Sequence, residues 1–209
     1  ALDSEPDRRF PTAGEFVQAM VGDDIATARA AEPVHGPSAI AVLPFENLSH
    51  DPADAYLSDG LSEELIHVLG GVAGLRVIAR TSSFAFRGTG ESIRDVALRL
   101  GVDTVLEGSV QRSGNRLRIR VRAVDGATEF ERWTERYDRA MDDVFAMQDE
   151  IAAAVVRTLV GERPAPPVGG RTADLQAYEA YLRGRHYWNT RTEAGLRRSI
   201  ECLDSAVAR

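Results

Sequence analysis

Three carboxylates stand close together in the segment Asp59–Leu65, namely Asp59, Glu63 and Glu64. Carboxylates grouped in this way are the residue type that general acid–base catalysis uses. No recognised motif places a histidine or a nucleophile beside them. Acids near the start of a helix also interact favourably with its macrodipole while remaining in solvent. The pattern therefore favours a solvated helix start over a hydrolytic site.

A basic, hydroxyl-rich sequence follows the strand predicted for residues 75–80 and comprises Arg80, Thr81, Ser82 and Ser83. Open α/β sheets bind ligands beyond the ends of their strands, and a guanidinium beside hydroxyls suits a phosphate or carboxylate. Serine hydroxyls also cap helices and loops, which is the competing structural interpretation. These four residues are the ligand-binding candidates, with a small anion as the expected ligand.

A row of arginines alternates with apolar residues in the order Arg116, Leu117, Arg118, Ile119, Arg120, Val121, Arg122, Ala123. This period of two predicts a half-exposed antiparallel strand. Outward arginines could bind nucleic acid, but Glu129, Glu131 and Glu135 on the next predicted strand can pair with them across the sheet. A net charge of -7 also disfavours a general nucleic-acid binder. We expect a salt-bridged outer face and no nucleic-acid partner.

Composition argues against metal, cofactor and membrane roles for this chain. Cys202 is the one cysteine, and His35, His50, His67 and His186 are scattered without metal-ligand spacing. No lysine follows Gly88 and Gly90 as a phosphate loop requires. No apolar run approaches the roughly 20 residues that a bilayer requires. The sequence predicts no metal, no cofactor and a reducing cytoplasmic location.

The elements that carry these side chains follow from hydrophobic periodicity. Residues 39–45 are nearly all apolar, which is typical of a strand buried on both faces. The predicted strands are 39–45, 75–80, 104–112, 116–125 and 129–137, and the predicted helices are 57–69, 92–100 and 142–159. The order β-α-β-α-β-β-β-α predicts an α+β fold with a mixed sheet and helices packed on one face. Trp133 and Tyr137 share one side of their strand and could line a pocket or, more commonly, pack in the core.

The flanks differ in character from this middle segment. A capping box at Thr12 and Glu15 predicts a short N-terminal helix within residues 1–22. Residues 23–37 and 161–173 are rich in Pro, Gly or Ala and are predicted linkers. Residues 174–209 are predicted to form a helical hairpin, and the middle domain spans 38–160.

Each part also resembles a known family. Ala1-Leu2, Pro6–Phe10 and Ala13–Phe16 resemble the C-terminal end of bacterial serine/threonine kinase domains. This resemblance covers about a tenth of the chain, and the catalytic kinase motifs are absent from it. It implies a kinase domain in the parent protein, and ATP and Mg²⁺ would belong to that missing domain alone.

The middle domain resembles the TolB-like amino-terminal domain of bacterial regulators over more than half of the chain. The segments that carry the resemblance are Ala41–Ser49, Asp59–Leu65, Leu75–Ser83, Val105–Val110, Trp133, Glu135–Asp138 and Gln148–Ile151. Glu129 stands where that family usually has a glycine. The resemblance implies a regulatory module without catalysis of its own.

The tail resembles a first tetratricopeptide repeat cut off at Arg209, through Ala177-Tyr178, Tyr181–Gly184, Tyr187-Trp188 and Ser199-Ile200. About three such repeats are needed for a stable stack. A lone repeat should leave Tyr181, Tyr187, Trp188 and Leu203 exposed, so these four residues are the candidates for binding a protein or peptide.

The sequence thus predicts a non-catalytic regulatory and interaction module that links a bacterial serine/threonine kinase to a tetratricopeptide platform. One alternative is a rigid scaffold segment of an adenylate cyclase-type or transcriptional regulator. The other is a small-anion or nucleotide-binding domain.

Overall fold

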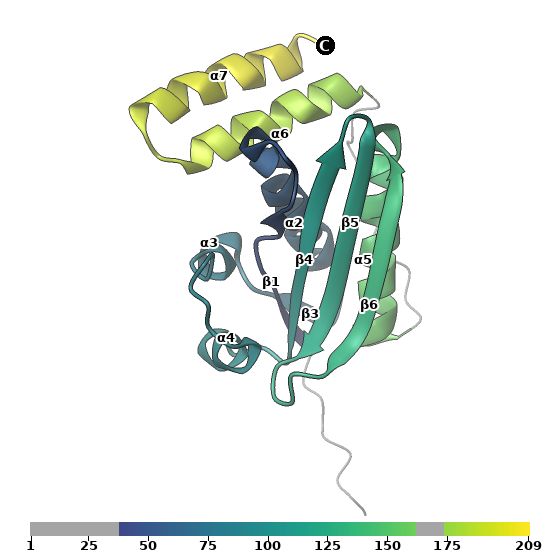
Figure 1. The fold of residues 1–209 in the computed structure, drawn as a ribbon. Coiled ribbons are helices and arrows are strands. Elements are labelled where there is room, and N and C mark those ends of the chain that lie inside the picture. Colours follow the sequence, from purple (N-terminus) through teal and green to yellow (C-terminus); the bar gives the residue numbers. More distant parts are fainter. Residues whose placement is uncertain (1–37, 162–173) are drawn as a thin grey trace, which may run out of the picture. The chain divides into compact units, whose positions relative to one another are not determined.

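The computed structural model describes residues 38–161 and 174–209. The predictions for residues 1–22 and 23–37, and for all but the first residue of the 161–173 linker, lie outside these residues. The elements are β1 (Ser38–Val42), β2 (Glu46–Asn47), η3 (Pro52–Asp54), α2 (Ala55–Gly70), β3 (Leu75–Val77), α3 (Arg80–Phe84), α4 (Ile93–Leu100), β4 (Thr104–Ser113), β5 (Arg116–Asp125), β6 (Glu131–Ala140), η4 (Met141–Asp143), α5 (Val144–Val160), α6 (Leu175–Asn189) and α7 (Glu193–Val207) (Figure 1).

One mixed sheet organises the described part of the α/β domain. Its strand order is β3-β1-β4-β5-β6, and the short β2 also pairs with β4. β1 runs parallel to β3 and β4, whereas β5 runs antiparallel to both β4 and β6. The predicted α+β class with a mixed sheet is confirmed.

Helices α2 and α5 lie together on one face of the sheet (Figure 1). Their apolar stripes meet the inward residues of the strands in one core, which contains Leu65, Ile151, Leu106 and Ile119. The same core includes the buried Tyr137, and Trp133 packs against it. Of the two roles predicted for Tyr137 and Trp133, the structure therefore shows packing in the core.

Helix α4 corrects the expected one-sided packing, because it covers the opposite face of β1 and β4. Val96 and Ala97 of α4 form a second cluster with Ala39, Ala41 and Val105. β1 needs this second cover because its residues are apolar on both faces, and burial of both faces removes that surface from water.

The segment after β3 also differs from the prediction of a strand through Arg80. β3 ends at Val77, where its pairing with β1 ends. The backbone N–H groups of Ser82 and Ser83 then bond to the oxygen of Ala79, which makes Arg80 the first residue of the short helix α3. The N–H of Ile78 still bonds to the oxygen of Ile40 on β1, but the helical turn that starts at Ala79 ends the extended segment before Arg80.

Two local signals in the sequence appear in the structure as expected. Ser92 caps α4 by accepting from the N–H of Asp95, and Gly101 ends it with a φ of 64°. β4 and β5 meet at the turn of Gly114 and Asn115, and β5 alternates buried and exposed residues from Arg116 onward.

The predicted helical hairpin is formed by α6 and α7 (Figure 1). Asp174 caps α6 by accepting from the N–H groups of Gln176 and Ala177, and Thr192 caps α7 by accepting from Gly195. These caps satisfy backbone donors that a helix start leaves without an internal partner.

Candidate functional site

Helix α6 packs against α2 and α5, and buried side chains fill the contact. The ring of Tyr178 lies 4.5 Å from that of Phe145 on α5, and the Tyr178 hydroxyl accepts a hydrogen bond from Gln148 Nε2. Leu182 is buried against Gly60 of α2, where the missing side chain lets the two helices approach closely. The hairpin is therefore joined to the α/β domain by a packed contact.

A buried carboxylate, Glu63, lies at the centre of the junction. Its side chain pairs with Arg80 of α3 through Oε1 and with Arg185 of α6 through Oε2. Asn189 Nδ2 of α6 also donates to Oε1 at 3.0 Å. Glu63 is only 4% exposed, and such a burial requires paired charges to offset the lost hydration. One carboxylate thus links three helices.

Asp59 makes a second charged contact one turn earlier on α2. It lies 3.0 Å from Nδ1 of His186 on α6 and also pairs with Arg87, which follows α3. Burial by itself would raise the pKa of Asp59, but hydrogen bonds from His186 and Arg87 outweigh it and hold the pKa below its ordinary value. Asp59 is therefore held as a carboxylate between the two neighbouring segments.

A third contact lies around the Tyr56 hydroxyl at the start of α2. It accepts hydrogen bonds from Arg112 of β4 at 3.0 Å and from Arg183 of α6 at 3.1 Å. Arg112 also lies 3.4 Å from Glu179 of α6. Burial, followed by the charge of Glu179, raises the pKa of Tyr56 despite the neighbouring arginines. The hydroxyl therefore remains protonated at neutral pH.

The prediction of a solvated helix start is wrong for Asp59 and Glu63, because α6 covers them. Glu64 is half-buried and lies 3.6 Å from Arg185. The sequence held a signal that was missed. Arg185, His186 and Asn189 lie close together on α6 at a spacing that can meet acids on a facing helix.

The predicted anion-binding residues belong partly to this junction. Arg80 pairs with Glu63 and lies 4.0 Å over the ring of Phe84. Ser83 is fully buried, and its hydroxyl has no hydrogen-bond partner in the described residues. An incoming anion would compete with Glu63 for Arg80, and anion binding by Arg80, Thr81, Ser82 and Ser83 stays a prediction.

The predicted partner-binding residues lie on the hairpin. Tyr181 is 36% and Trp188 48% exposed, whereas Tyr187 and Leu203 are half-buried. Leu203 of α7 packs against Gly184 of α6, so part of its surface is used within the hairpin. Binding of a protein or peptide to these residues stays a prediction.

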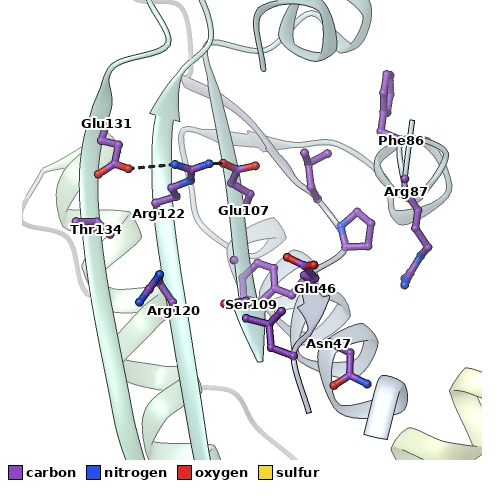
Figure 2. Close-up of a pocket in the computed structure, with 16 residues that line it drawn as sticks. Glu46, Asn47, Phe86, Arg87, Glu107, Ser109, Arg120, Arg122, Glu131 and Thr134 are labelled. Carbon is purple, nitrogen blue, oxygen red and sulfur yellow. Dashed lines mark hydrogen bonds and ion pairs between the residues drawn. The ribbon is translucent and has the colours of Figure 1, made fainter. Parts of the chain in front are cut away.

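The arginine row of β5 points outward, and most of its members have acidic partners. Arg116 and Arg118 pair with Asp138 of β6, at 2.6 and 2.9 Å. Figure 2 shows Arg122 between Glu131 and Glu107, and the distance to Glu131 is 3.2 Å. The expected salt-bridged face is thus observed, although Asp138 and Glu107 take the place of Glu129 and Glu135.

Glu129 and Glu135 have other contacts. Glu129 adopts a φ of 62° and accepts a hydrogen bond from the backbone N–H of Arg94, and Glu135 accepts a hydrogen bond from the hydroxyl of Tyr137. A positive φ is a conformation that glycine adopts without strain, so this position suits the glycine that the resemblance to the TolB-like family implies.

The described ranges, 38–161 and 174–209, contain neither a cluster of metal-binding side chains nor a membrane-spanning helix. No group of three or more His, Cys, Asp or Glu side chains in them is arranged to hold a metal ion. No helix in these ranges has the length and apolar character required to cross a bilayer.

Comparisons with known proteins identify relatives of the α/β domain. Residues 37–154 match the family described as HilA/YgeH-like transcriptional regulator, second domain. A protein of Rhizobium meliloti (strain 1021) named "Putative adenylate cyclase 3" is 46% identical over 151 residues, which are 70% of this chain and 26% of that protein. The chain thus spans about a quarter of the length of this relative.

Solved structures with a similar fold share little sequence with the chain. The LpoB C-terminal domain from Salmonella enterica is 17% identical, with a TM-score of 0.41 over 53% of this chain and 88% of that chain. TolB from Acinetobacter baumannii is 13% identical, with a TM-score of 0.46 over 59% of this chain and 28% of that chain. Lipoprotein GNA1162 from Neisseria meningitidis is 20% identical, with a TM-score of 0.43 over 60% of this chain and 99% of that chain.

Proposed function

The chain belongs to the family of HilA/YgeH-like transcriptional regulators, second domain, and we propose that it is a non-catalytic connector within a multidomain regulator. The connector would hold the α6–α7 hairpin in a fixed orientation on the α/β domain. A protein or peptide bound to the hairpin, or to helical repeats that continue it, would then act on the α/β domain through the α2–α6 junction.

The observation that carries this proposal is the buried position of Glu63 between α2, α3 and α6. A flexible tether would need no buried charge at its attachment point. A buried ion pair stabilises one geometry more than its alternatives, because removing one partner leaves the other charge unpaired in a poorly hydrated site. The contact therefore supports a junction of defined orientation.

The same contacts argue against a hydrolytic role for the α2 acids. Asp59 is 7% exposed and paired with Arg87 and His186, and Glu63 is paired with Arg80 and Arg185. A general acid or base must reach its substrate proton within hydrogen-bond distance. Carboxylates that are buried and already paired are poorly suited to that task.

The type of effector domain is a further part of the proposal. The regulator family and the Rhizobium relative favour a transcriptional or adenylate cyclase-type regulator over a kinase. The kinase interpretation depends on residues 1–22, which neither the family match nor the described structure includes, and it stays a prediction.

The orientation of the hairpin can be measured by NMR residual dipolar couplings on the whole chain. We expect couplings from residues 38–161 and 174–189 to fit one alignment tensor. The double variant Arg185→Gln, His186→Gln replaces Arg185, the charged α6 partner of Glu63, and His186, the α6 partner of Asp59, and should make the two sets of couplings fit different tensors. Arg197→Gln is the matched control, since Arg197 pairs with Glu193 on the exposed surface of α7.

Two results would contradict the connector. The first is wild-type chain in which the two segments already need separate tensors. The second is a double variant that behaves like Arg197→Gln, because the buried pairs would then have no part in fixing the hairpin.

A further inference from the structure

A groove of about 900 Å³ lies on the outer face of the sheet. One of its lining residues, Arg87, also pairs with Asp59 of the α2–α6 junction. The floor of the groove is formed by β2, β4 and β5, and the segment of Phe86–Gly88 after α3 forms a wall (Figure 2). Small-molecule sites in proteins typically enclose about 300–1,000 Å³. The groove is therefore large enough for a small organic ligand.

One cross-strand row of polar side chains runs through this groove. The sheet register places Glu46 beside Ser109, Ser109 beside Arg120, and Arg120 beside Arg136. Adjacent strands lie about 4.8 Å apart, so the row spans from an acid to two bases over roughly 14 Å. Glu46, Ser109 and Arg120 line the groove, and Arg136 continues the row on β6.

At the positive end of the cross-strand row Arg120 lacks a counter-charge, and Arg136 reaches only a shared one. Asp138 is shared by Arg116, Arg118 and Arg136, and its contact with Arg136 is long at 3.8 Å. Arg120 has neither an ion-pair nor a hydrogen-bond partner for its side chain anywhere in residues 38–161 and 174–209. Its neighbours across the strands are Ser109 and Arg136. The other outward arginines of β5, by contrast, each reach an acid.

Glu46, at the negative end of the cross-strand row, also lacks a charged partner in the described residues. Within the described structure the carboxylate of Glu46 forms no ion pair, and the hydroxyl of Ser109 has no hydrogen-bond partner. A simple anion at Arg120 would leave Glu46 without a partner. A polyanion would also face the carboxylates of Glu46, Glu107 and Glu131, which line the same groove.

We propose that this groove binds a short zwitterion whose carboxylate pairs with Arg120 and whose ammonium pairs with Glu46. The Ser109 hydroxyl lies between these ends and can donate to or accept from the middle of the ligand. The Cα atoms of Glu46 and Arg120 are two strand spacings apart, about 9–10 Å. A ligand that reaches both residues must span most of this distance, which fits a dipeptide better than a single α-amino acid. This inference is independent of the connector function.

Glycylglycine is a suitable probe, with N-acetylglycylglycine and glycylglycinamide as forms that lack one charge. Titrations of the whole chain would be followed by amide chemical shifts at Gly108 and Ser109. We expect saturable shifts with glycylglycine and about tenfold weaker binding of each blocked form, because each loses one charge-assisted hydrogen bond. Inorganic phosphate should bind more weakly than glycylglycine.

Single substitutions test which residue binds the carboxylate and which binds the ammonium of glycylglycine. Arg120→Gln should weaken glycylglycine about tenfold, and Arg118→Gln should leave it unchanged. Arg118 is the matched control because it belongs to the same row but is paired with Asp138 and does not line the groove. Glu46→Gln should weaken glycylglycine and leave N-acetylglycylglycine unaffected.

The proposal is overturned if glycylglycine causes no saturable shift, or if both blocked forms bind as well as glycylglycine. It is also overturned if Arg120→Gln and Arg118→Gln bind alike. Thermal unfolding of each variant shows whether it is folded, and if Arg120→Gln does not fold, the response of Glu46→Gln and the blocked peptides decides.

Discussion

The close approach of α2 and α6 at Gly60 gives a sharp test of the junction. A Cβ added to Gly60 would lie 2.7 Å from Cδ2 and 2.9 Å from Cδ1 of Leu182. Leu182 is 2% exposed, so its side chain has little space into which to move. Gly60→Ala should therefore separate α6 from α2 without altering any charged group.

Gly60→Ala should have opposite effects on the stability of the α/β domain and on the docking of the hairpin. Alanine is favoured over glycine inside a helix by about 1 kcal/mol, so the α/β domain should gain stability. Overpacking of a buried contact costs about 1–3 kcal/mol, and this cost falls on the docking of α6. We therefore expect a more stable α/β domain and a hairpin that separates from it more easily.

The two tryptophans allow these effects to be measured separately. Trp133 lies on β6 and Trp188 on α6, so single-tryptophan forms, made with Trp188→Phe or Trp133→Phe, report each part. In urea unfolding, Gly60→Ala should move the Trp188 transition to lower urea and leave the Trp133 transition equal or higher.

A double-mutant cycle with Leu182→Ala tests the mechanism. Leu182→Ala by itself should cost about 2–5 kcal/mol of docking, because it leaves a cavity. With Leu182 truncated, the methyl group that Gly60→Ala adds meets no leucine, so the two changes should couple by more than about 0.5 kcal/mol. Additive effects, or a Trp188 transition that Gly60→Ala does not lower, would refute the proposed contact.

Three further predictions concern charge and backbone packing. Because the pKa of Asp59 is lowered in the folded chain, its stabilisation of the junction is present above its ordinary value of 3.8 and is lost as the pH falls through the lowered value. The Trp188 signal should therefore show hairpin release in acid, and Asp59→Asn should show weaker docking at neutral pH with less acid dependence. Gly108→Ala should lower the thermal unfolding midpoint by an amount equivalent to at least about 1–3 kcal/mol, because its Cβ would overlap the backbone oxygen of Arg120 and lie 3.0 Å from the ring of Phe45; an unchanged midpoint would contradict this packing. Duplex DNA at near-physiological ionic strength should not shift in a binding assay, whereas a salt-sensitive shift abolished by Arg118→Ala plus Arg120→Ala would show that the outer face binds nucleic acid.

Local sequence was sufficient for the elements whose signals lie within a few residues. Helix α4 begins after Ser92 and ends at Gly101 because a side-chain cap and a left-handed glycine are local devices. The alternation from Arg116 onward predicted β5 and its exposed face, because side chains on a strand alternate between its two sides.

Tertiary structure alone decided the environment of the acids and of Arg120. The spacing of Asp59 and Glu63 is the same whether a helix start faces water or another helix, and the covering residue Asn189 is 126 positions away from Glu63. Arg120 looks like its neighbours in the sequence. Its missing counter-charge depends on which residues of β4 and β6 stand beside it, and that register is set by the packing of the whole sheet.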